Sequence, residues 1–507
     1  MNLTQTEFDV IILGGGITGA GTARDCAMRG LKVLLIEKGD ISNGATGRNH
    51  GLLHSGARYA VTDRESAEEC IRENRTLKAV APHCVEDTSG LFVTLPEDDL
   101  GYQETFVKSC IAAGIEAEVL DPKEAVTLEP SVNQDIIGAV RVPDGAVDPF
   151  KLCAANILDA RLHGAVILTY HEVCSFIRSG VSVIGVQVRD LKTGETMEFR
   201  APVTVNACGI WGQKMVRMAG AELGMFPAKG SMLIYSRRVN KMAINRCRKP
   251  ANADILVPGG PVCVIGTTSS RVPSDQCDRP YVTPEEVDEL LREGVKLAPV
   301  LASTRILRAY AGVRPLVSVD NDPSGRNVSR GFVCIDHETR DGIGGFVTIA
   351  GGKLTSYRLM AEKTADLVCA KLNVVEQCRT AVTLLPDPSC KEAREEYNGS
   401  LVCECERISE KELRDYASRD GVDRLSGFRR RSRFGMGVCQ GILCACRASV
   451  ILADETGSAE GASSDLRNFM CERWKGLRPV AWGDTLREVE RTQWINSEII
   501  GINETER

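Results

Sequence analysis

Residues 8–30 read FDVIILGGGITGAGTARDCAMRG, and this stretch decides the fold. The apolar run at 8–13 is typical of a buried strand, and the glycines that follow it, Gly14-x-Gly16-x-x-Gly19, open a segment with helical spacing. A second apolar run at 31–36 closes at Glu37. Strand, glycine turn, helix and strand together predict a βαβ unit.

The glycine turn has the residue types that a dinucleotide site needs. Gly14 permits the tight turn, Gly16 lets the backbone approach a pyrophosphate, and Gly19 lets the helix pack on the sheet. Free N–H groups at the helix start would bind the pyrophosphate, and Glu37 would hold a ribose hydroxyl. The same turn also occurs as a plain structural connection, and it does not separate NAD from FAD.

Two further glycine-rich segments favour FAD. Residues 44–59, GATGRNHGLLHSGARY, follow the second strand, and residues 351–355, GGKLT, open another helix. FAD is longer than one βαβ unit can hold, and a helix start suits the flavin edge, where negative charge develops on reduction. Strands are predicted at 138–142, 165–168 and 346–350, helices at 151–162, 284–296 and 355–372, and a hairpin over 181–205. This mixture suggests a parallel sheet interrupted by an antiparallel layer.

Composition excludes several classes of protein. A chain of 507 residues predicts two or three domains, and 62 Lys and Arg against 68 Asp and Glu leave no basic field for nucleic acid. No apolar stretch is long enough to span a membrane, and no secretory signal is apparent. The 20 cysteines are mostly scattered among apolar neighbours, which indicates a reduced, cytoplasmic interior.

Four cysteines near the end form a pattern of their own. Cys403 and Cys405 are followed, after a long gap, by Cys439 and Cys444, with Cys446 as a spare thiol. Four thiolates suit zinc or an iron–sulfur cluster, and the one-residue gap in the first pair is poor for zinc. We expect an iron–sulfur cluster, with zinc or no metal as the alternatives.

Two features beside the cysteines have more than one interpretation. The run of arginines at 429–433 would dock an acidic partner or lipid headgroups, or form a solvated helix face, which we favour. Residues 453–464 are predicted to be a flexible joint, and Trp474 and Trp482 to belong to an exposed docking tail or a strap over the main domain.

The segments GGGITGAGTARDCAMRG, GATGRNHGLLHSGARYAVTD, VNACGIWG, GVRPL and GGKLTSYRLMAE resemble the FAD-dependent glycerol-3-phosphate dehydrogenases, over nearly the whole chain. The resemblance implies an α/β fold: a Rossmann-like FAD-binding domain of the glutathione-reductase and amino-acid-oxidase type with an interleaved antiparallel substrate domain. The cysteine segment resembles the [2Fe–2S] module of bacterioferritin-associated ferredoxin, as in the anaerobic members of the family. The implied divisions are an FAD and substrate region at 1–378 (substrate segments 79–145 and 222–320), a linker at 379–400, the module at 401–452 and a tail at 453–507.

The resemblance also implies the site residues. Those along FAD are Gly14, Gly15, Gly16, Gly19, Glu37, Thr46, His50, Val173, Ala207, Gly209, Gly352, Lys353, Leu354 and Thr355. Those at the substrate are Arg58, Tyr59, Arg314 and Lys353, with Arg330 as a catalytic candidate. His54 is a second catalytic candidate because the near-neutral reference pKa of histidine suits a base, and an ordinary core histidine is the equal alternative. The ligands of the cluster are Cys403, Cys405, Cys439 and Cys444.

The implied reaction oxidises sn-glycerol 3-phosphate to dihydroxyacetone phosphate, with hydride passing to FAD. The general base stays open, because aerobic relatives carry a His soon after a Lys-Gly-Ser turn, and here Met232 follows Lys229-Gly230-Ser231. Arginines suit the phosphate dianion because their planar fork donates two parallel hydrogen bonds.

The implied partners are a smaller flavoprotein subunit, which would carry any FMN of the complex, and a membrane-anchoring iron–sulfur subunit that passes electrons to quinone. The chain itself would lie in the cytoplasm, peripheral on the inner face of the membrane. The alternatives are an amine or opine oxidoreductase flavoprotein subunit and a non-catalytic electron-transfer subunit.

Overall fold

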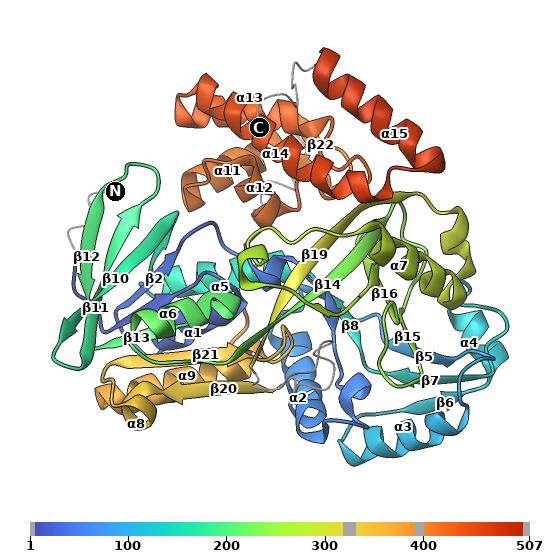
Figure 1. Cartoon of the computed structure of the whole chain (residues 1–507), viewed down its shortest axis with the longest axis horizontal. Coiled ribbons are helices and arrows are strands. Elements are labelled where there is room, and N and C mark those ends of the chain that lie inside the picture. The colour runs from blue at the N-terminus through green and yellow to red at the C-terminus, as the bar shows by residue number, and fades with distance from the viewer. Residues whose placement is uncertain (1–5, 318–330, 390–399, 500–507) are drawn as a thin grey trace.

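The computed structural model describes residues 6–317, 331–389 and 400–499. Its centre is a six-stranded sheet in the order β20-β21-β13-β1-β2-β9, parallel except for β20 (Figure 1). The predicted βαβ unit is confirmed as β1, α1 and β2. The bounds of the elements of this layer are β1 (Val10–Leu13), α1 (Ile17–Met28), β2 (Val33–Glu37), β9 (Val166–Thr169), β13 (Val203–Asn206), β20 (Phe332–Asp336) and β21 (Phe346–Gly351).

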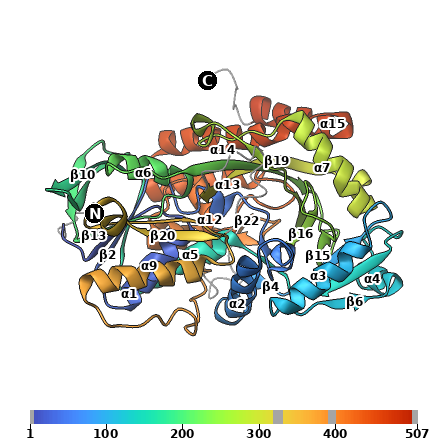
Figure 2. The same ribbon diagram turned by 60° about the horizontal axis from the view of Figure 1, so that its bottom comes forward.

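The sheet is buried on both faces, which explains the unbroken apolar runs of its strands. Val10 and Ile12 of β1 face a core shared with the helices α1, α5 (Pro149–Leu162) and α9 (Tyr357–Leu372). Ile11 and Leu13 face the opposite core, which includes the antiparallel layer β10 (His171–Ser179), β11 (Ser182–Asp190) and β12 (Thr196–Arg200). Figure 2 shows α1, α5 and α9 on one side of this sheet.

A second sheet, of nine strands, follows the order β18-β14-β17-β16-β15-β5-β7-β6, with β19 paired to β14. Its pairs are antiparallel except β5 with β15. The strands are β5 (Gly90–Thr94), β6 (Glu118–Leu120), β7 (Gly138–Val142), β14 (Met225–Tyr235), β15 (Ala243–Arg246), β16 (Ile255–Gly259), β17 (Val262–Gly266), β18 (Ser270–Arg271) and β19 (Ile306–Val317). The long pair β14 and β19 runs from the main sheet toward the C-terminal helices (Figure 1).

The remaining elements of the first 389 residues surround these sheets. They are β3 (Leu52–Leu53), α2 (Arg64–Val80), β4 (Val85–Glu86), α3 (Gly101–Ala112), α4 (Pro122–Leu128), β8 (Gly145–Val147), α6 (Gly212–Met218), α7 (Pro284–Leu297) and α8 (His337–Asp341). The predicted strands and helices are confirmed, and the predicted hairpin is β11 with β12. The last part of the 181–205 segment differs, because β13 leaves the hairpin and joins the parallel sheet beside β1.

Residues 400–499 form a C-terminal module with its own core (Figure 1). Its elements are β22 (Leu401–Cys403), β23 (Ile408–Ser409), α11 (Glu410–Asp420), α12 (Leu425–Ser432), α13 (Cys444–Thr456), α14 (Ala459–Leu477) and α15 (Gly483–Trp494). None of the described helices is both long enough and apolar enough to cross a lipid bilayer.

The structure corrects two expectations for this region and decides between two alternatives for a third. The flexible joint at 453–464 is wrong, since α13 continues to Thr456 and the side chain of Ser458 caps α14. Of the two tryptophans, Trp474 is half-buried and Trp482 is 41% exposed. A Cβ on Gly476 of α14 would lie 2.6 Å from the Ala309 carbonyl oxygen of β19, so the segment lies over the main domain as a strap.

The solvated face expected for residues 429–433 is also wrong. Arg431 donates two hydrogen bonds, of 2.9 and 3.0 Å, to the Asp40 carboxylate at the end of β2, and Arg430 lies 3.4 Å from the same group. Arg433 reaches Asp148, at the start of α5, at 3.0 Å. These arginines attach the module to the dinucleotide-binding domain, an arrangement that neither alternative anticipated.

Candidate active site

The glycine turn is sterically required. Gly14 has φ +108°, and a Cβ there would lie 2.7 Å from the Ala207 carbonyl oxygen. A Cβ on Gly19 would lie 2.0 Å from the Gly14 oxygen. Gly16 caps α1, whose Ile17 N–H donates to the Thr46 hydroxyl at 3.0 Å. The start of α1 can therefore approach a ligand closely with its backbone.

Glu37 closes the turn from the end of β2. Its two carboxylate oxygens accept hydrogen bonds from the Gly15 N–H at 2.6 Å and the Gly39 N–H at 2.7 Å. Burial raises the pKa of Glu37, and the two backbone donors oppose that shift. The carboxylate thus orders the turn from behind, and its expected contact with a ribose stays a prediction.

A cavity of about 1410 Å³ opens from this turn. It is lined by most of the residues expected at FAD or substrate: Gly14, Gly16, Glu37, Thr46, His50, His54, Arg58, Tyr59, Val173, Ala207, Gly209, Arg314, Gly352, Lys353, Leu354 and Thr355. Gly15 and Gly19 shape the turn without lining the cavity. Arg330 lies outside the described residues. A helix start and a long cavity beyond it fit FAD.

Two histidines lie together in the cavity. The ring centroids of His50 and His54 are 5.9 Å apart, and the backbone N–H of His54 donates to Thr355 at 3.2 Å. Burial lowers the pKa of His50 to about 3, and the charges of Arg314 and Arg58 add to the effect. Burial also lowers the pKa of His54, with contributions from His50, Arg58 and Lys353. Both rings are therefore neutral at pH 7, and a neutral imidazole accepts a proton.

Arg58 is held by a buried acid. Its guanidinium donates to Asp254 at 3.0 Å and to the Ala251 carbonyl at 3.2 Å, and its other terminal nitrogen is buried without a hydrogen-bond partner among the described residues. Asp254 is 1% exposed and also accepts from Arg248 at 2.9 Å.

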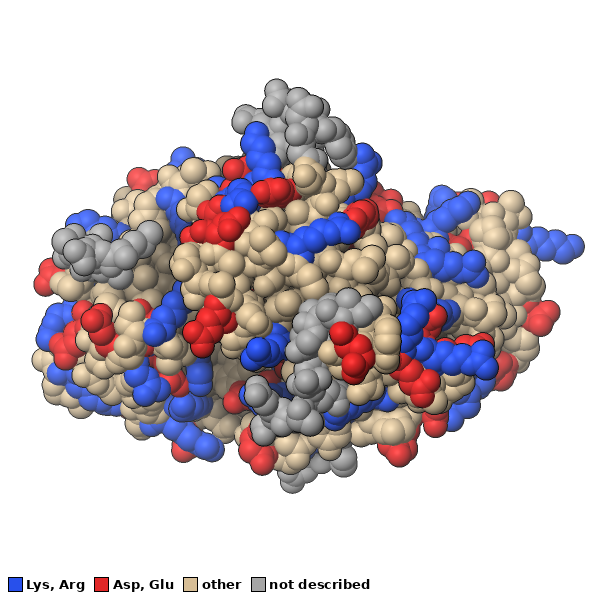
Figure 3. Space-filling model, turned by 90° about the horizontal axis from the view of Figure 1, so that it is seen from above, with Lys and Arg blue, Asp and Glu red and all other residues tan. Residues whose placement is uncertain are grey.

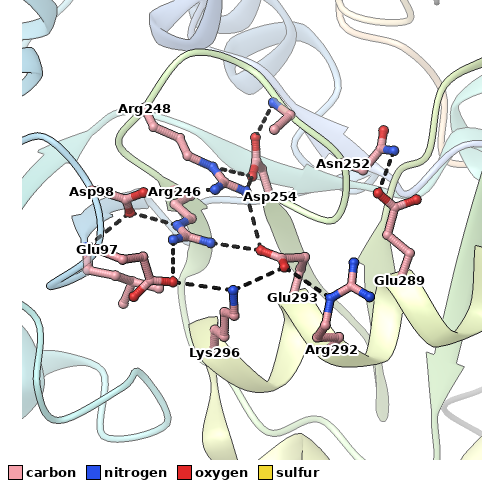
Figure 4. A network of polar contacts seen from close by, with 12 residues as sticks. Glu97, Asp98, Arg246, Arg248, Asn252, Asp254, Glu289, Arg292, Glu293 and Lys296 are labelled. Atoms are coloured by element: carbon pink, nitrogen blue, oxygen red, sulfur yellow. Dashed lines mark hydrogen bonds and ion pairs between the residues drawn. The ribbon is translucent and has the colours of Figure 1, made fainter.

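This acid belongs to a wider network, drawn in Figure 4. Arg248 continues to Glu293 of α7, and Glu293 also binds Arg246, at 3.0 Å. Arg246 in turn binds Glu97 and Asp98. This network of ion pairs on the second sheet therefore orients the Arg58 guanidinium toward the cavity.

Arg314 approaches from β19, across β14. The expected Lys229-Gly230-Ser231 turn is wrong, because these residues lie within β14 and pair with β19. A Cβ on Gly230 would lie 2.5 Å from the Arg314 guanidinium, so β14 leaves room for this side chain there. Arg314 donates to Thr267 and to the Thr268 carbonyl, the latter at 3.3 Å.

Lys353 and Tyr59 meet on another wall. The Lys353 ammonium lies 4.9 Å from the centroid of the Tyr59 ring, and that ring lies 5.4 Å from the ring of His54. The cavity thus gathers cationic groups from 44–59, β19 and the turn before α9 around two neutral imidazoles.

Sequence reasoning missed other residues of the cavity. Arg48, Lys249 and Thr267 also line it. Arg48 lies within the glycine-rich segment GATGRNH, so the sequence could have indicated it as a residue of the cavity. Lys249 and Thr267 come from loops of the second sheet, where no local pattern marks them.

The four cysteines expected to bind a cluster lie next to one another. The thiol of Cys444 hydrogen-bonds to those of Cys403 and Cys439, and Cys439 also contacts Cys405. These contacts lower the pKa of Cys403 to about 7 and that of Cys439 to about 5. A Cβ on Gly437 would lie 2.2 Å from the Cys405 Cβ, so the glycine loop closes on the thiols. Within the described part of the chain, no three or more such side chains take a metal-binding arrangement.

The comparisons with known proteins agree with this geometry. Residues 9–358 match the family described as FAD dependent oxidoreductase, so the fold and cavity are those of a flavin-dependent oxidoreductase. Among the relatives of the whole chain are the A subunits of two anaerobic glycerol-3-phosphate dehydrogenases. The chain is 55% identical to the one from Escherichia coli, covering 98% of each, and 53% identical to the one from Haemophilus influenzae, covering 99% of this chain and 95% of the relative. The chain belongs to this family of anaerobic glycerol-3-phosphate dehydrogenase A subunits.

A solved structure supports the fold. The glycerol-3-phosphate dehydrogenase from Bacillus halodurans complexed with FAD superposes with a TM-score of 0.69, over 96% of this chain and 97% of that one, at 23% identity. The two chains therefore share their fold over nearly their whole length.

Proposed function

We propose that the protein is the catalytic subunit of an anaerobic glycerol-3-phosphate dehydrogenase, oxidising sn-glycerol 3-phosphate to dihydroxyacetone phosphate. The observation that carries the proposal is the presence of Arg58, Arg314 and Lys353 in the cavity that opens from the glycine turn. A phosphate dianion needs such a set of cations, whereas a carboxylate substrate needs fewer.

The residues of the chain divide the work of binding and orientation. Arg314, Lys353 and Arg58, which Asp254 orients, bind and neutralise the substrate phosphate. FAD, held by the residues named for it above, would supply the acceptor for the hydride of the secondary carbon. The family likeness of the turn and of residues 352–355 supports FAD binding by the residues named for it above.

The proton of the alcohol must pass to a base. His54 is our candidate, since it is neutral, lines the cavity and lies beside Tyr59 and His50. Its lowered pKa makes it a weak base, so the nearby cations must lower the pKa of the bound alcohol as well. Arg330, the other catalytic candidate from the resemblance, would act on the alkoxide only electrostatically.

The one-residue gap between Cys403 and Cys405 favours a [2Fe–2S] cluster over zinc as the group that these four thiols would bind. Such a cluster would pass the electrons of a reduced flavin singly to a partner. The relatives are named as subunits, which supports a multi-subunit complex. We propose a smaller flavoprotein subunit, with any FMN of the complex, and a membrane-anchoring iron–sulfur subunit as partners, with quinone as acceptor and the chain peripheral on the cytoplasmic face of the membrane.

Anaerobic titration tests the activity. Adding sn-glycerol 3-phosphate to the purified FAD-bound protein should bleach the flavin absorbance, and Arg314→Met should raise the concentration needed by at least 100-fold. Arg292→Met, an exposed arginine of α7, is the matched control and should behave like the parent. Bleaching by glycine or an opine but not by the phosphate ester would instead support an amine or opine oxidoreductase, and no bleaching by any small substrate would support a non-catalytic role.

The cluster has an independent test. Protein purified anaerobically should contain about two irons per chain and give the electron paramagnetic resonance signal of a reduced [2Fe–2S] centre. Cys405→Ser should lose both, whereas Cys471→Ser, which changes an exposed thiol of the same module, should keep them. Zinc in place of iron in the parent protein would overturn this part of the proposal.

A further inference from the structure

A second cavity, of about 560 Å³, lies between the main domain and the C-terminal module. Arg48 and His50 line both this cavity and the larger one, so the two adjoin. Its other walls include Arg308 of β19, Arg429 of α12 and Arg473 of α14. Gln440, the residue after Cys439, also lines it. The second cavity therefore separates the proposed flavin site from the thiols.

The charges around this cavity are unbalanced. Three of the acids that line it have other partners: Asp40 binds Arg430 and Arg431, Asp278 accepts from the Trp211 indole, and Asp465 accepts from the Leu425 N–H. The guanidinium groups of Arg308 and Arg429 have no ion pair or hydrogen bond with any residue that the structure describes, although that of Arg308 lies 5.7 Å from the Tyr310 ring centroid.

The guanidinium groups of these arginines contain buried hydrogen-bond donors that no described residue satisfies. The Nε atoms of Arg308, Arg429 and Arg473 are all buried without a hydrogen-bond acceptor in the described residues. Arg473 uses its terminal nitrogens on the Gln440 side chain, at 3.4 Å, and on the Gly435 carbonyl.

Burying these positive charges together is electrostatically unfavourable, and the pKa of Arg429 shows it. Burial, together with the charges of Arg308 and Arg430, lowers the pKa of Arg429 to about 9. Glu472, the carboxylate that opposes this shift at Arg429, is an exposed residue. Buried like charges of this kind are stable when an anion of opposite charge lies among them.

We propose that the second cavity is a binding site for a small phosphate-bearing anion. The arginine fork matches phosphate oxygens, and Arg308, Arg429 and Arg473 converge from three elements that are separate in sequence. Tyr281, Tyr310 and Phe469 add aromatic surface to the walls, so a phosphate ester of mononucleotide size is accommodated as well as free phosphate. The site is distinct from the proposed substrate site, because Arg314 and Lys353 line the larger cavity alone.

Equilibrium dialysis of the FAD-bound full chain tests the site, with radiolabelled inorganic phosphate as one probe and adenosine 5′-monophosphate as the other. Arg429→Met and Arg308→Met should each weaken binding at least tenfold, and Arg429→Lys should restore part of it. Arg314→Met, in the larger cavity, and Arg414→Met, in an exposed ion-pair cluster of the module, should leave this binding unchanged. Tighter binding of the nucleotide than of phosphate would identify an ester as the ligand, and equal binding would identify free phosphate.

Two results would overturn the proposal: no saturable binding of either probe, or binding that Arg314→Met abolishes and Arg429→Met does not. Thermal unfolding guards against misfolded variants. Phosphate should raise the melting temperature of the parent and of Arg414→Met by similar amounts, and should raise that of Arg429→Met less, even if this variant is less stable. A rise of equal size in Arg429→Met would also contradict the site.

Discussion

At the scale of single residues, the site depends on side chains that other side chains orient. Arg58 faces the cavity, but the acid that holds it, Asp254, is 196 positions away in the chain. Asp254 is buried and also binds Arg248 and the Ala251 N–H, the latter at 2.6 Å. It is a positioning residue, since it touches the arginine and not the cavity.

Asp254→Asn should therefore weaken substrate binding more than it slows turnover. An amide cannot neutralise two guanidinium groups, and a buried charge that loses its partner costs about 3–5 kcal/mol. We expect KM for sn-glycerol 3-phosphate to rise 10- to 100-fold, with kcat within about fivefold of the parent in steady-state assays. Glu289→Gln, which touches the same network only through Asn252, is the control and should change neither constant. An equal loss in kcat and kcat/KM would contradict a positioning role.

The two cavity histidines predict a pH dependence of stability. Burial holds the pKa of both below the value of about 6.5 in the unfolded chain. As pH falls below about 6.5, the two histidines become protonated in the unfolded chain and stay neutral in the folded protein. The free energy of unfolding therefore falls by about 1.4 kcal/mol per pH unit for each histidine. For His50 this loss continues down to about pH 3.

Urea unfolding of the FAD-free protein at pH 7.0 and 5.5 measures this effect. The midpoint of the parent should drop with pH, and the drop should be smaller in His50→Gln because one of the two groups is gone. Parallel declines in the two proteins would show that other groups dominate.

At the scale of elements, the turn between β1 and α1 predicts that a glycine-to-alanine change at Gly19 is unfavourable, although helix propensity alone would favour alanine. Replacing a helical glycine with alanine ordinarily stabilises by up to about 1 kcal/mol. At Gly19 the new Cβ would lie 2.0 Å from the Gly14 oxygen, so α1 must move away from β1. Gly19→Ala should therefore weaken FAD binding at least tenfold, as measured by flavin fluorescence during dialysis. Gly259→Ala, where the nearest atoms are 4.0 Å away, should keep the parent affinity.

At the scale of the whole molecule, the C-terminal module is attached by the packing of α14 on β19 and by buried charged contacts. Asp40 is 3% exposed and accepts from both Arg430 and Arg431, and Arg433 bridges to Asp148 and Glu406. By contrast, the face drawn in Figure 3 carries interleaved positive and negative side chains without a broad field of either sign.

Asp40→Asn should loosen the module. It leaves two buried guanidinium groups without their carboxylate, at a cost of about 3–5 kcal/mol. We expect faster amide hydrogen exchange in α12 and in the start of α5, measured by mass spectrometry, with exchange in α3 unchanged. Asp454→Asn changes an acid of the same module that lies beside an exposed arginine, and it should exchange like the parent. Unchanged protection of α12 in Asp40→Asn would place the attachment elsewhere.

The sequence by itself determined the dinucleotide-binding unit. Strand β1, the glycine turn, α1 and β2 follow from local rules: apolar runs, glycine conformations and helix spacing all act within a few residues of one another. The same is true of the hairpin β11–β12, of helices α5 and α7, and of the short gap that sets Cys403 and Cys405 side by side in the chain.

Only the tertiary structure decided which charged residues are buried and with which partners. The composition of the run 429–433 is typical of a solvated helix face. The acid that binds it, Asp40, lies 391 positions before Arg431, so no local pattern indicates that the run is buried. Likewise β13 leaves its hairpin for the parallel sheet, and Arg308, Arg429 and Arg473 come together from three separate elements. Burial and ion pairing depend on contacts between distant segments, and these contacts have no signature in local periodicity or spacing.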